Sequence, residues 1–165
     1  MLSIRLEVFP GSYNNCDVYE KVLTYISLKS CHGGYGFFPY DIDSIIRDFQ
    51  LSEKYSVQKS YQKMWHFIIS FSEKLPDAFA LILADKTAKI FYKDYQVYYG
   101  LDKETSHLHI HFAVNAYSYH PEKVILNRDA MFNYSKIILN EFKNVFPETQ
   151  TILSFQKEGK SCLNH

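Results

Sequence analysis

Three histidines alternate with apolar residues at positions 107, 109 and 111 of the sequence. In a β-strand, successive side chains point to opposite faces. His107, His109 and His111 are therefore expected to share one face of a strand, with Asn115 further along the same face. Neutral imidazoles are common metal ligands, so this row indicates a metal site. The pattern does not identify the metal.

A catalytic metal takes about three protein ligands and keeps one position open. His109 and His111 form the central pair of such a site. Asp102, Glu104 and His107, at the mouth of the histidine row, are the candidates for the third ligand. Oxygen ligands combined with imidazole suit manganese or magnesium as well as zinc.

The composition indicates a folded protein. The chain has 165 residues, enough to bury a core, and 47% of them are apolar. Basic and acidic residues balance at 18 each, so net charge gives no support to nucleic-acid binding, although a local basic patch is still compatible with it. The three cysteines lack metal-finger spacing and indicate reduced thiols. With no signal peptide and no membrane segment, we expect a single cytoplasmic domain over residues 1–165.

Hydrophobic periodicity predicts the elements that would position these residues. Strands are predicted at 2–8, 65–72, 95–101 and 107–117, and helices at about 16–28, 41–50, 76–91 and 127–146, in the order β-α-α-β-α-β-β-α. Residues 29–39 are predicted as a glycine-containing loop, 51–62 as an exposed segment, and 150–165 as weakly determined, with a short strand at 151–155.

The short connection at 102–106 predicts an antiparallel hairpin that ends in the histidine strand. His66, in the near-continuous apolar run of the 65–72 strand, is expected to be a core residue. The element order predicts an α+β fold with a central antiparallel β-sheet and helices packed on its faces.

Residues 98–115 (YYGLDKETSHLHIHFAVN) resemble the third motif of the MobP-type relaxases, which are HUH endonucleases of plasmid and transposon mobilisation. That motif reads His-x-Asp, a short gap, and then His-x-His-x-x-x-Asn. Trp65 through Ser72 resembles the family's "hhhISFS" strand, and Leu23 through Ser30 resembles its N-terminal "Y-I/V-x-x-x-K-T" motif. The sequence departs from the pattern at Asp102, which aligns with the family's first histidine, whereas Glu104 aligns with its aspartate.

The resemblance implies a relaxase-type, circularly permuted palm-like HUH fold and single-strand DNA transesterification at an origin of transfer. The tyrosine precedes the histidine motif, as in relaxases rather than replication initiators, so Tyr25 would be the nucleophile that forms a 5′-phosphotyrosine and frees a 3′-OH. The metal ligands would be Asp102, His109 and His111, with Glu104, His107 and Asn115 as alternative ligands or supporting residues and with Lys29 and Ser30 contacting DNA. Gly33, Gly34 and Gly36 would let their loop lie against the DNA. A relaxosome accessory protein and a coupling ATPase are the implied partners.

Three other interpretations stay open. A relaxase-like module could bind origin DNA without nicking, because Asp102 replaces the first histidine. A metal-dependent phosphoesterase could use water as the nucleophile. Finally, the histidines could bind zinc structurally. Because relaxases usually carry more chain after this domain, the sequence is expected to be either a minimal relaxase or a fragment.

Overall fold

The computed structural model describes residues 1–9, 14–38, 41–104 and 106–157, which form six strands and four helices. In chain order the elements are β1 (Ser3–Phe9), α1 (Val18–Ser27), β2 (Cys31–Tyr35), α2 (Ile42–Tyr55), β3 (Met64–Phe71), α3 (Asp77–Tyr92), β4 (Tyr95–Asp102), β5 (His109–Ser118), α4 (Arg128–Val145) and β6 (Gln150–Phe155). Of the weakly determined segment at 150–165, residues 158–165 lie outside the described residues.

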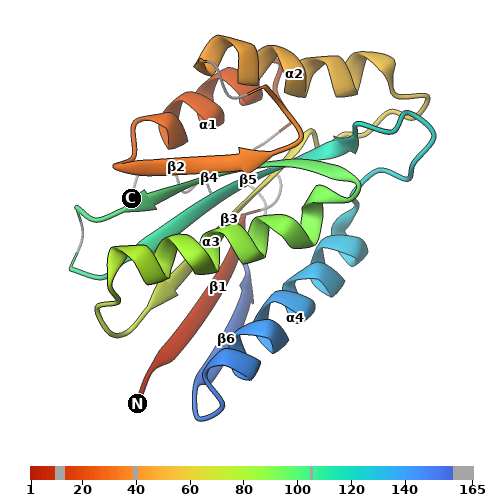
Figure 1. The fold of residues 1–165 in the computed structure, drawn as a ribbon. Helices are drawn as coiled ribbons and strands as arrows, with labels where there is room; N and C mark the ends of the chain where they lie inside the picture. Colours follow the sequence, from red (N-terminus) through yellow and green to blue (C-terminus); the bar gives the residue numbers. More distant parts are fainter. Residues whose placement is uncertain (10–13, 39–40, 105, 158–165) are drawn as a thin grey trace.

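The six strands form one sheet in the order β2-β4-β5-β3-β1-β6 (Figure 1). The neighbours pair antiparallel except β1 and β6, which run parallel. The predicted α+β class is therefore confirmed, while the sheet is mixed rather than purely antiparallel. The predicted hairpin is present, with β4 and β5 paired along their length.

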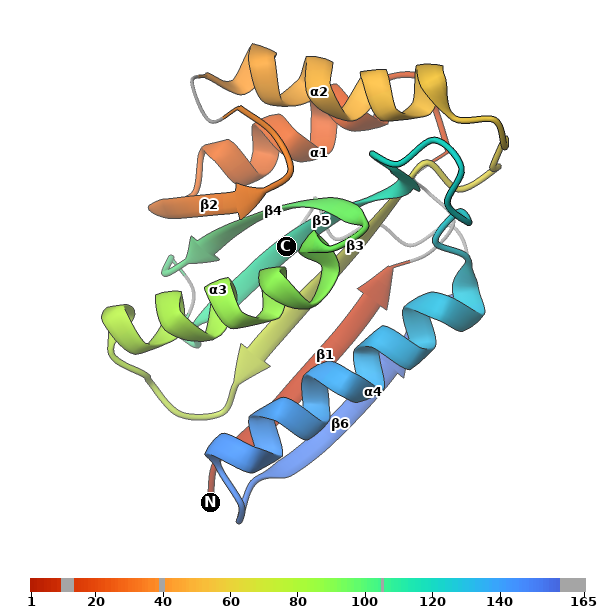
Figure 2. The same cartoon turned by 45° about the vertical axis from the view of Figure 1, so that its right-hand side comes forward.

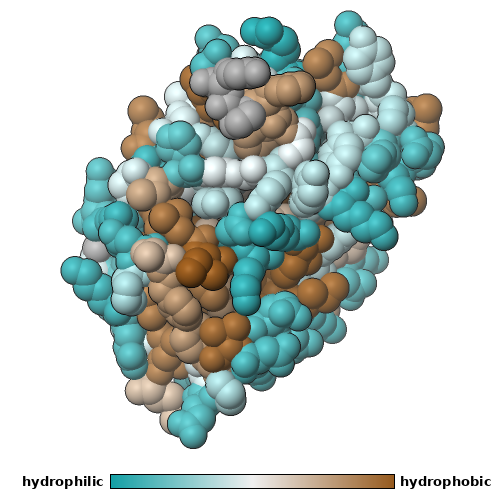
Figure 3. All heavy atoms as spheres, in the orientation of Figure 1, coloured by the Kyte–Doolittle hydropathy of each residue, from teal (hydrophilic) through white to brown (hydrophobic). Residues whose placement is uncertain are grey.

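The helices cover both faces of the sheet, with α1 and α2 on one side and α3 and α4 on the other (Figures 1 and 2). Side-chain alternation in β3 explains this division. Phe67 and Ile69 join the larger core under α3 and α4, whereas His66 and Ile68 face α1 and α2. Apolar side chains also gather on the surface that carries α3 and α4 (Figure 3). None of the described helices has the length and apolar character needed to cross a bilayer.

Helix α2 is longer than the sequence predicted. It begins where expected, because the Asp41 side chain accepts a hydrogen bond from the Ser44 backbone N–H at 2.7 Å. It then continues to Tyr55, into the segment predicted to be exposed. Ser52 explains the extension, since it is buried and its hydroxyl bonds to the Gln96 side chain at 2.8 Å.

The prediction of a loop over residues 29–39 was wrong for Cys31–Tyr35, which form edge strand β2. This strand pairs with β4, with Cys31 opposite Leu101. The glycines permit that pairing, because a Cβ on Gly34 would lie 2.1 Å from the Val97 carbonyl oxygen. The close approach that the glycines indicated is therefore to β4 rather than to a ligand. With β2 and β6 included, the element order is β-α-β-α-β-α-β-β-α-β.

Candidate active site

The β4–β5 hairpin brings the predicted ligands together. Asp102 lies directly opposite His109 across the two strands, and Gly100 lies opposite His111. In an antiparallel pair, opposite residues project to the same face. Asp102 and His111 are both buried, and their facing atoms, Asp102 Oδ2 and His111 Nε2, are 3.6 Å apart.

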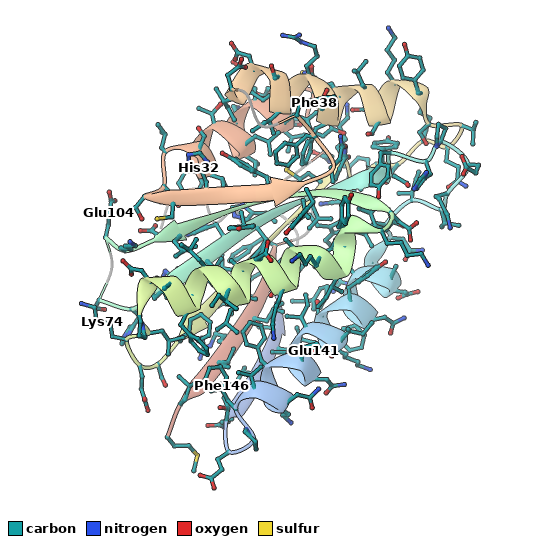
Figure 4. All side chains as sticks on the ribbon, viewed as in Figure 1. His32, Phe38, Lys74, Glu104, Glu141 and Phe146 are labelled. Carbon is teal, nitrogen blue, oxygen red and sulfur yellow. The ribbon has the colours of Figure 1, made fainter. Side chains whose placement is uncertain are left out.

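Two other candidate ligands lie apart from this pair. Strand β5 begins at His109, so the prediction that His107 lies in this strand was wrong, and His107 is exposed in the preceding bend. Glu104 is also exposed and projects from the turn at the edge of the molecule (Figure 4). Only its backbone contributes to the site, because its N–H donates to Asp102 Oδ1 at 3.1 Å.

Helix α1 carries Tyr25 to the histidines. Its apolar face, which includes Val22 and Ile26, is fully buried against the sheet, and Tyr25 is half-buried beside that face. The Tyr25 ring centroid lies 5.4 Å from that of His111 and 6.3 Å from that of His66, in edge-on orientations. The predicted nucleophile and the histidine row therefore belong to one cluster.

The end of α1 is held close to β4. The Ser30 hydroxyl donates to the Leu101 carbonyl at 3.0 Å, which fixes the chain as it leaves the helix. Gly100 makes room for the helix end, because a Cβ there would lie 2.9 Å from the Ile26 carbonyl oxygen and 3.0 Å from Lys29 Cβ. Lys29 is thereby directed along β4 toward Asp102.

Lys29 and Asp102 form a buried ion pair. Lys29 Nζ donates to Asp102 Oδ2 at 2.6 Å, and the two side chains are 12% and 4% exposed. Burial raises the pKa of Asp102, but the bonds from Lys29 and the Glu104 backbone outweigh burial and leave the pKa below its usual value. Burial likewise lowers the pKa of Lys29, and its interactions with Asp102 and Tyr25 reverse that effect. Both groups are therefore charged at neutral pH.

The Lys29 ammonium also contacts the predicted nucleophile, since Nζ lies 4.3 Å from the centroid of the Tyr25 ring. A cation over an aromatic face is attracted to the ring electrons. Lys29 and Ser30 were expected to contact DNA. In the structure they bind within the protein, Lys29 to Asp102 and Ser30 to the Leu101 carbonyl.

His66, which the sequence indicated as a core residue, is both fully buried and part of the cluster. Its Nε2 lies 3.3 Å from His111 Nδ1. Among the buried side-chain polar atoms described, His111 Nε2 is without a hydrogen-bond partner. A hydrogen on His111 Nδ1 would donate to His66 and leave the Nε2 lone pair for a metal, whereas a hydrogen on Nε2 would point at Asp102. Metal-binding histidines typically donate through their second nitrogen, as in the first of these arrangements.

Both imidazoles are neutral at neutral pH. Burial lowers the pKa of His111 to about 4, and the Lys29 charge contributes to the decrease, against a smaller opposing effect of Asp102. The pKa of His66 lies well below its ordinary value because of burial and the neighbouring His111. Neutral imidazole is the form that binds a metal or accepts a proton.

Two of these donors are spaced to share a divalent cation. The 3.6 Å between Asp102 Oδ2 and His111 Nε2 accommodates two bonds of about 2.1 Å to one ion, and the unpartnered Nε2 supplies a lone pair. His109 is the nearest third donor by register. Within the described ranges, however, no three His, Cys, Asp or Glu side chains are already arranged around a common point for a metal. The carboxylate instead faces Lys29.

Asn115, the last residue of the histidine motif, has a structural role. Its side-chain amide is fully buried and donates to the Phe49 carbonyl at 2.9 Å and to Gln96 Oε1 at 2.8 Å. Its Oδ1 accepts the Tyr117 backbone N–H at 3.1 Å. These bonds connect α2 to β4 and β5, so Asn115 supports the face on which the site lies.

An open polar cleft of about 330 Å³ adjoins the histidine row. His107 and His109 form its edge on the β5 side, and serines together with Arg5 and Glu7 line the rest. The lining residues are Ser3, Arg5, Glu7, Ser70, Phe71, Ser72, His107 and His109. A more apolar cavity of about 300 Å³ lies between α3 and α4, across the sheet from the histidines. Of these two cavities, the polar cleft is the one on the side of the sheet that carries the histidine row.

No curated protein and no solved structure matched the chain. A family model for the nuclease domain of MobA/VirD2-like relaxases matches residues 26–144, which is more than half of the chain. The match includes Lys29, His66 and the whole histidine strand, and it starts one residue after Tyr25. The chain therefore belongs to the MobA/VirD2-like relaxase nuclease-domain family.

Proposed function

We propose that this protein nicks and rejoins single-stranded DNA at an origin of transfer, with Tyr25 as the nucleophile. The family is one of nuclease domains that act in DNA mobilisation. The observation that carries the proposal of a tyrosine nucleophile is that Tyr25, Lys29 and His111 lie together. The Tyr25 ring lies within 5.4 Å of His111 and has the Lys29 ammonium 4.3 Å from its centroid.

The chemistry is a transesterification. The Tyr25 oxygen attacks a backbone phosphorus and forms a phosphotyrosine bond while the bond from phosphorus to the 3′ oxygen breaks. A base accepts the phenol proton, and the leaving 3′ oxygen takes up a proton to become a free hydroxyl. The ester is conserved in the protein–DNA bond, so the reverse attack by a 3′-OH rejoins the strand.

Lys29 supplies the charge that this reaction needs from the protein. A phenol is a weak nucleophile until it loses its proton, so the reaction also needs a base. The Lys29 ammonium would offset negative charge that develops on the phosphate in the transition state. A Lys29 side chain held beside Tyr25 and Asp102 is placed for this effect.

Asp102, His109 and His111 would hold a divalent metal, with manganese or magnesium favoured by the carboxylate and zinc also compatible. Such an ion polarises the scissile phosphate when bound. His66 would fix the ring of His111, through its contact at Nδ1, so that Nε2 faces the ion.

The polar cleft beside His109 is the proposed path of the DNA strand. Arg5 is exposed there, 3.6 Å from the Glu7 carboxylate, and could turn its charge to a phosphate, while the serine hydroxyls offer further hydrogen bonds. A relaxosome accessory protein and a coupling ATPase are the proposed partners in the cell.

A second candidate function is DNA binding without nicking. The Lys29–Asp102 pair favours it, because the carboxylate that replaces the family's first histidine is already neutralised by the protein. In that case the cleft would hold single-stranded DNA while Tyr25 stays unmodified.

A gel assay distinguishes these functions. The protein is incubated with labelled single-stranded DNA that covers its candidate transfer origin, with manganese or with EDTA. Tyr25→Phe tests the nucleophile, and Tyr61→Phe, at an exposed tyrosine far along the chain, is the matched control. We expect a denaturant-resistant protein–DNA band for the wild type and Tyr61→Phe that is absent for Tyr25→Phe and reduced by EDTA.

Other outcomes separate the alternatives. DNA binding without any adduct supports the binding module and refutes nicking. If the DNA is cleaved without an adduct, and Tyr25→Phe still cleaves it, the result supports a phosphoesterase that uses water.

A further inference from the structure

We propose that the Lys29 ammonium and a divalent cation compete for the Asp102 carboxylate, so that Lys29 sets the metal affinity of the site. The inference rests on the proposed function, because it concerns the same site. It adds a property of this chain: an internal cation that must give way before a metal can bind.

One carboxylate oxygen faces both potential partners. Asp102 Oδ2 accepts from Lys29 Nζ at 2.6 Å and lies 3.6 Å from His111 Nε2. A metal shared by Asp102 and His111 would have to bind this same oxygen, next to an ammonium that is 12% exposed and has little room to retreat. Two cations on one buried oxygen repel each other strongly, because little water screens them.

The second carboxylate oxygen is also engaged. Asp102 Oδ1 accepts the Glu104 backbone N–H at 3.1 Å, which holds the carboxylate in its present orientation. Lys29 is also held from its own side, by the contact with the Tyr25 ring and by the close approach of α1 to Gly100. The ion pair is therefore built into the fold at both ends.

The competition accounts for how the donors are arranged. His111 Nε2 is buried and lacks a hydrogen-bond partner, as expected for an atom reserved for an ion. Yet no three donors in the described part of the chain converge as a ready metal site. An ammonium that occupies the carboxylate explains both observations.

The test is manganese binding to the DNA-free protein, measured by calorimetry and by the loss of the free Mn²⁺ electron paramagnetic resonance signal. Lys29→Met removes the competing charge, and we expect it to bind Mn²⁺ at least tenfold more tightly than the wild type. Lys29→Arg keeps the charge and should bind as weakly as the wild type. Lys21→Met is the matched control, since Lys21 is an exposed lysine on α1 that pairs with Asp17.

Two further variants keep the test decisive. Asp102→Asn in the Lys29→Met background should abolish the gain, because the contested oxygen ligand has been replaced. Lys29→Gln carries the test if thermal melting shows that Lys29→Met does not fold. Equal Mn²⁺ affinity in the wild type and in the folded charge-removing variant would overturn the proposal, as would an equal gain in Lys21→Met. Because no DNA is present, this result is independent of whether the protein forms a covalent adduct.

Discussion

Gly100→Ala tests whether the close approach of α1 to β4 assembles the site. The added Cβ would lie 2.9 Å from the Ile26 carbonyl oxygen, which is 0.5 Å shorter than the 3.4 Å at which ordinary van der Waals contacts begin. It would also lie 3.0 Å from Lys29 Cβ. The first atom is backbone in the last turn of the helix, so the helix end itself must move away.

The expected cost follows from this geometry. Overpacking of this kind destabilises a protein by about 1–3 kcal/mol. For a chain of this size, each kcal/mol lowers the melting temperature by about 2–4 °C. Moving the helix end also displaces Tyr25 and Lys29, and misplacing a reacting group by about 1 Å can slow a reaction roughly 100-fold.

The measurement is thermal or urea unfolding together with the rate of adduct formation on single-stranded DNA. Gly33→Ala is the matched control. Gly33 lies in β2, and a Cβ there would meet the tip of the Tyr99 side chain of β4, at 2.8 Å, rather than helix backbone. We expect Gly100→Ala to lose both stability and rate, and Gly33→Ala to lose less of each. If Gly100→Ala melts at the wild-type temperature, the tight contact between α1 and β4 is refuted.

Three other features give separate expectations. The pKa of His111 is about 4 in the folded protein and about 6.5 in the unfolded chain, so the unfolded chain takes up the proton first as the pH falls. The stability that comes from keeping His111 neutral is therefore complete above pH 6.5 and is lost toward pH 4, by on the order of 3 kcal/mol. Urea midpoints across that range should fall less in His111→Asn than in the wild type. Asp102→Asn should cost about 3 kcal/mol in urea unfolding, because it leaves Lys29 buried without a counter-charge, whereas Glu104→Gln at the exposed turn should change stability by less than about 0.5 kcal/mol. Arg5→Ala should weaken single-stranded DNA binding and reduce its salt dependence by about one phosphate contact without changing Mn²⁺ affinity, and an unchanged salt slope would exclude the cleft as the DNA path.

The parts of the site that lie on one hairpin were predictable from the sequence. Alternation identified the strand that carries His109 and His111, and the short connection indicated an antiparallel partner. Because opposite residues of a hairpin share a face, Asp102 had to lie near both histidines. Local periodicity is sufficient here, since all three residues fall within ten positions of the chain.

Strand β2 could not be predicted in the same way. Its sequence, Cys-His-Gly-Gly-Tyr, has no alternation and contains two residues that disfavour strands. It is a strand because β4 lies beside it and because Gly33 and Gly34 allow the close approach. Tertiary contacts determine this element, and the sequence carried only the indirect signal that something lies close to the glycines.

The role of His66 was missed for a related reason. A histidine within an apolar run is usually a core residue, and burial of this one is complete. The strand register is what places it in the site, because β3 pairs with β5 such that Ser70 lies opposite His109. Positions of even parity in β3 therefore share the face of the histidine row, and His66 is one of them.

By its resemblance to the relaxase motif, the sequence places Asp102 at the position of the family's first histidine, which would change the charge of the site as well as its ligand set. A carboxylate that is 4% exposed is costly to bury without a positive partner. Strand order provides one, because β2 lies next to β4 and the chain enters β2 from the end of α1, which brings Lys29 beside Asp102 across 73 positions of sequence. On our proposal, a carboxylate that attracts a hard divalent cation is thus also the one that Lys29 already pairs with. Which of the two cations holds the carboxylate would then decide whether the site works through a metal or through Lys29.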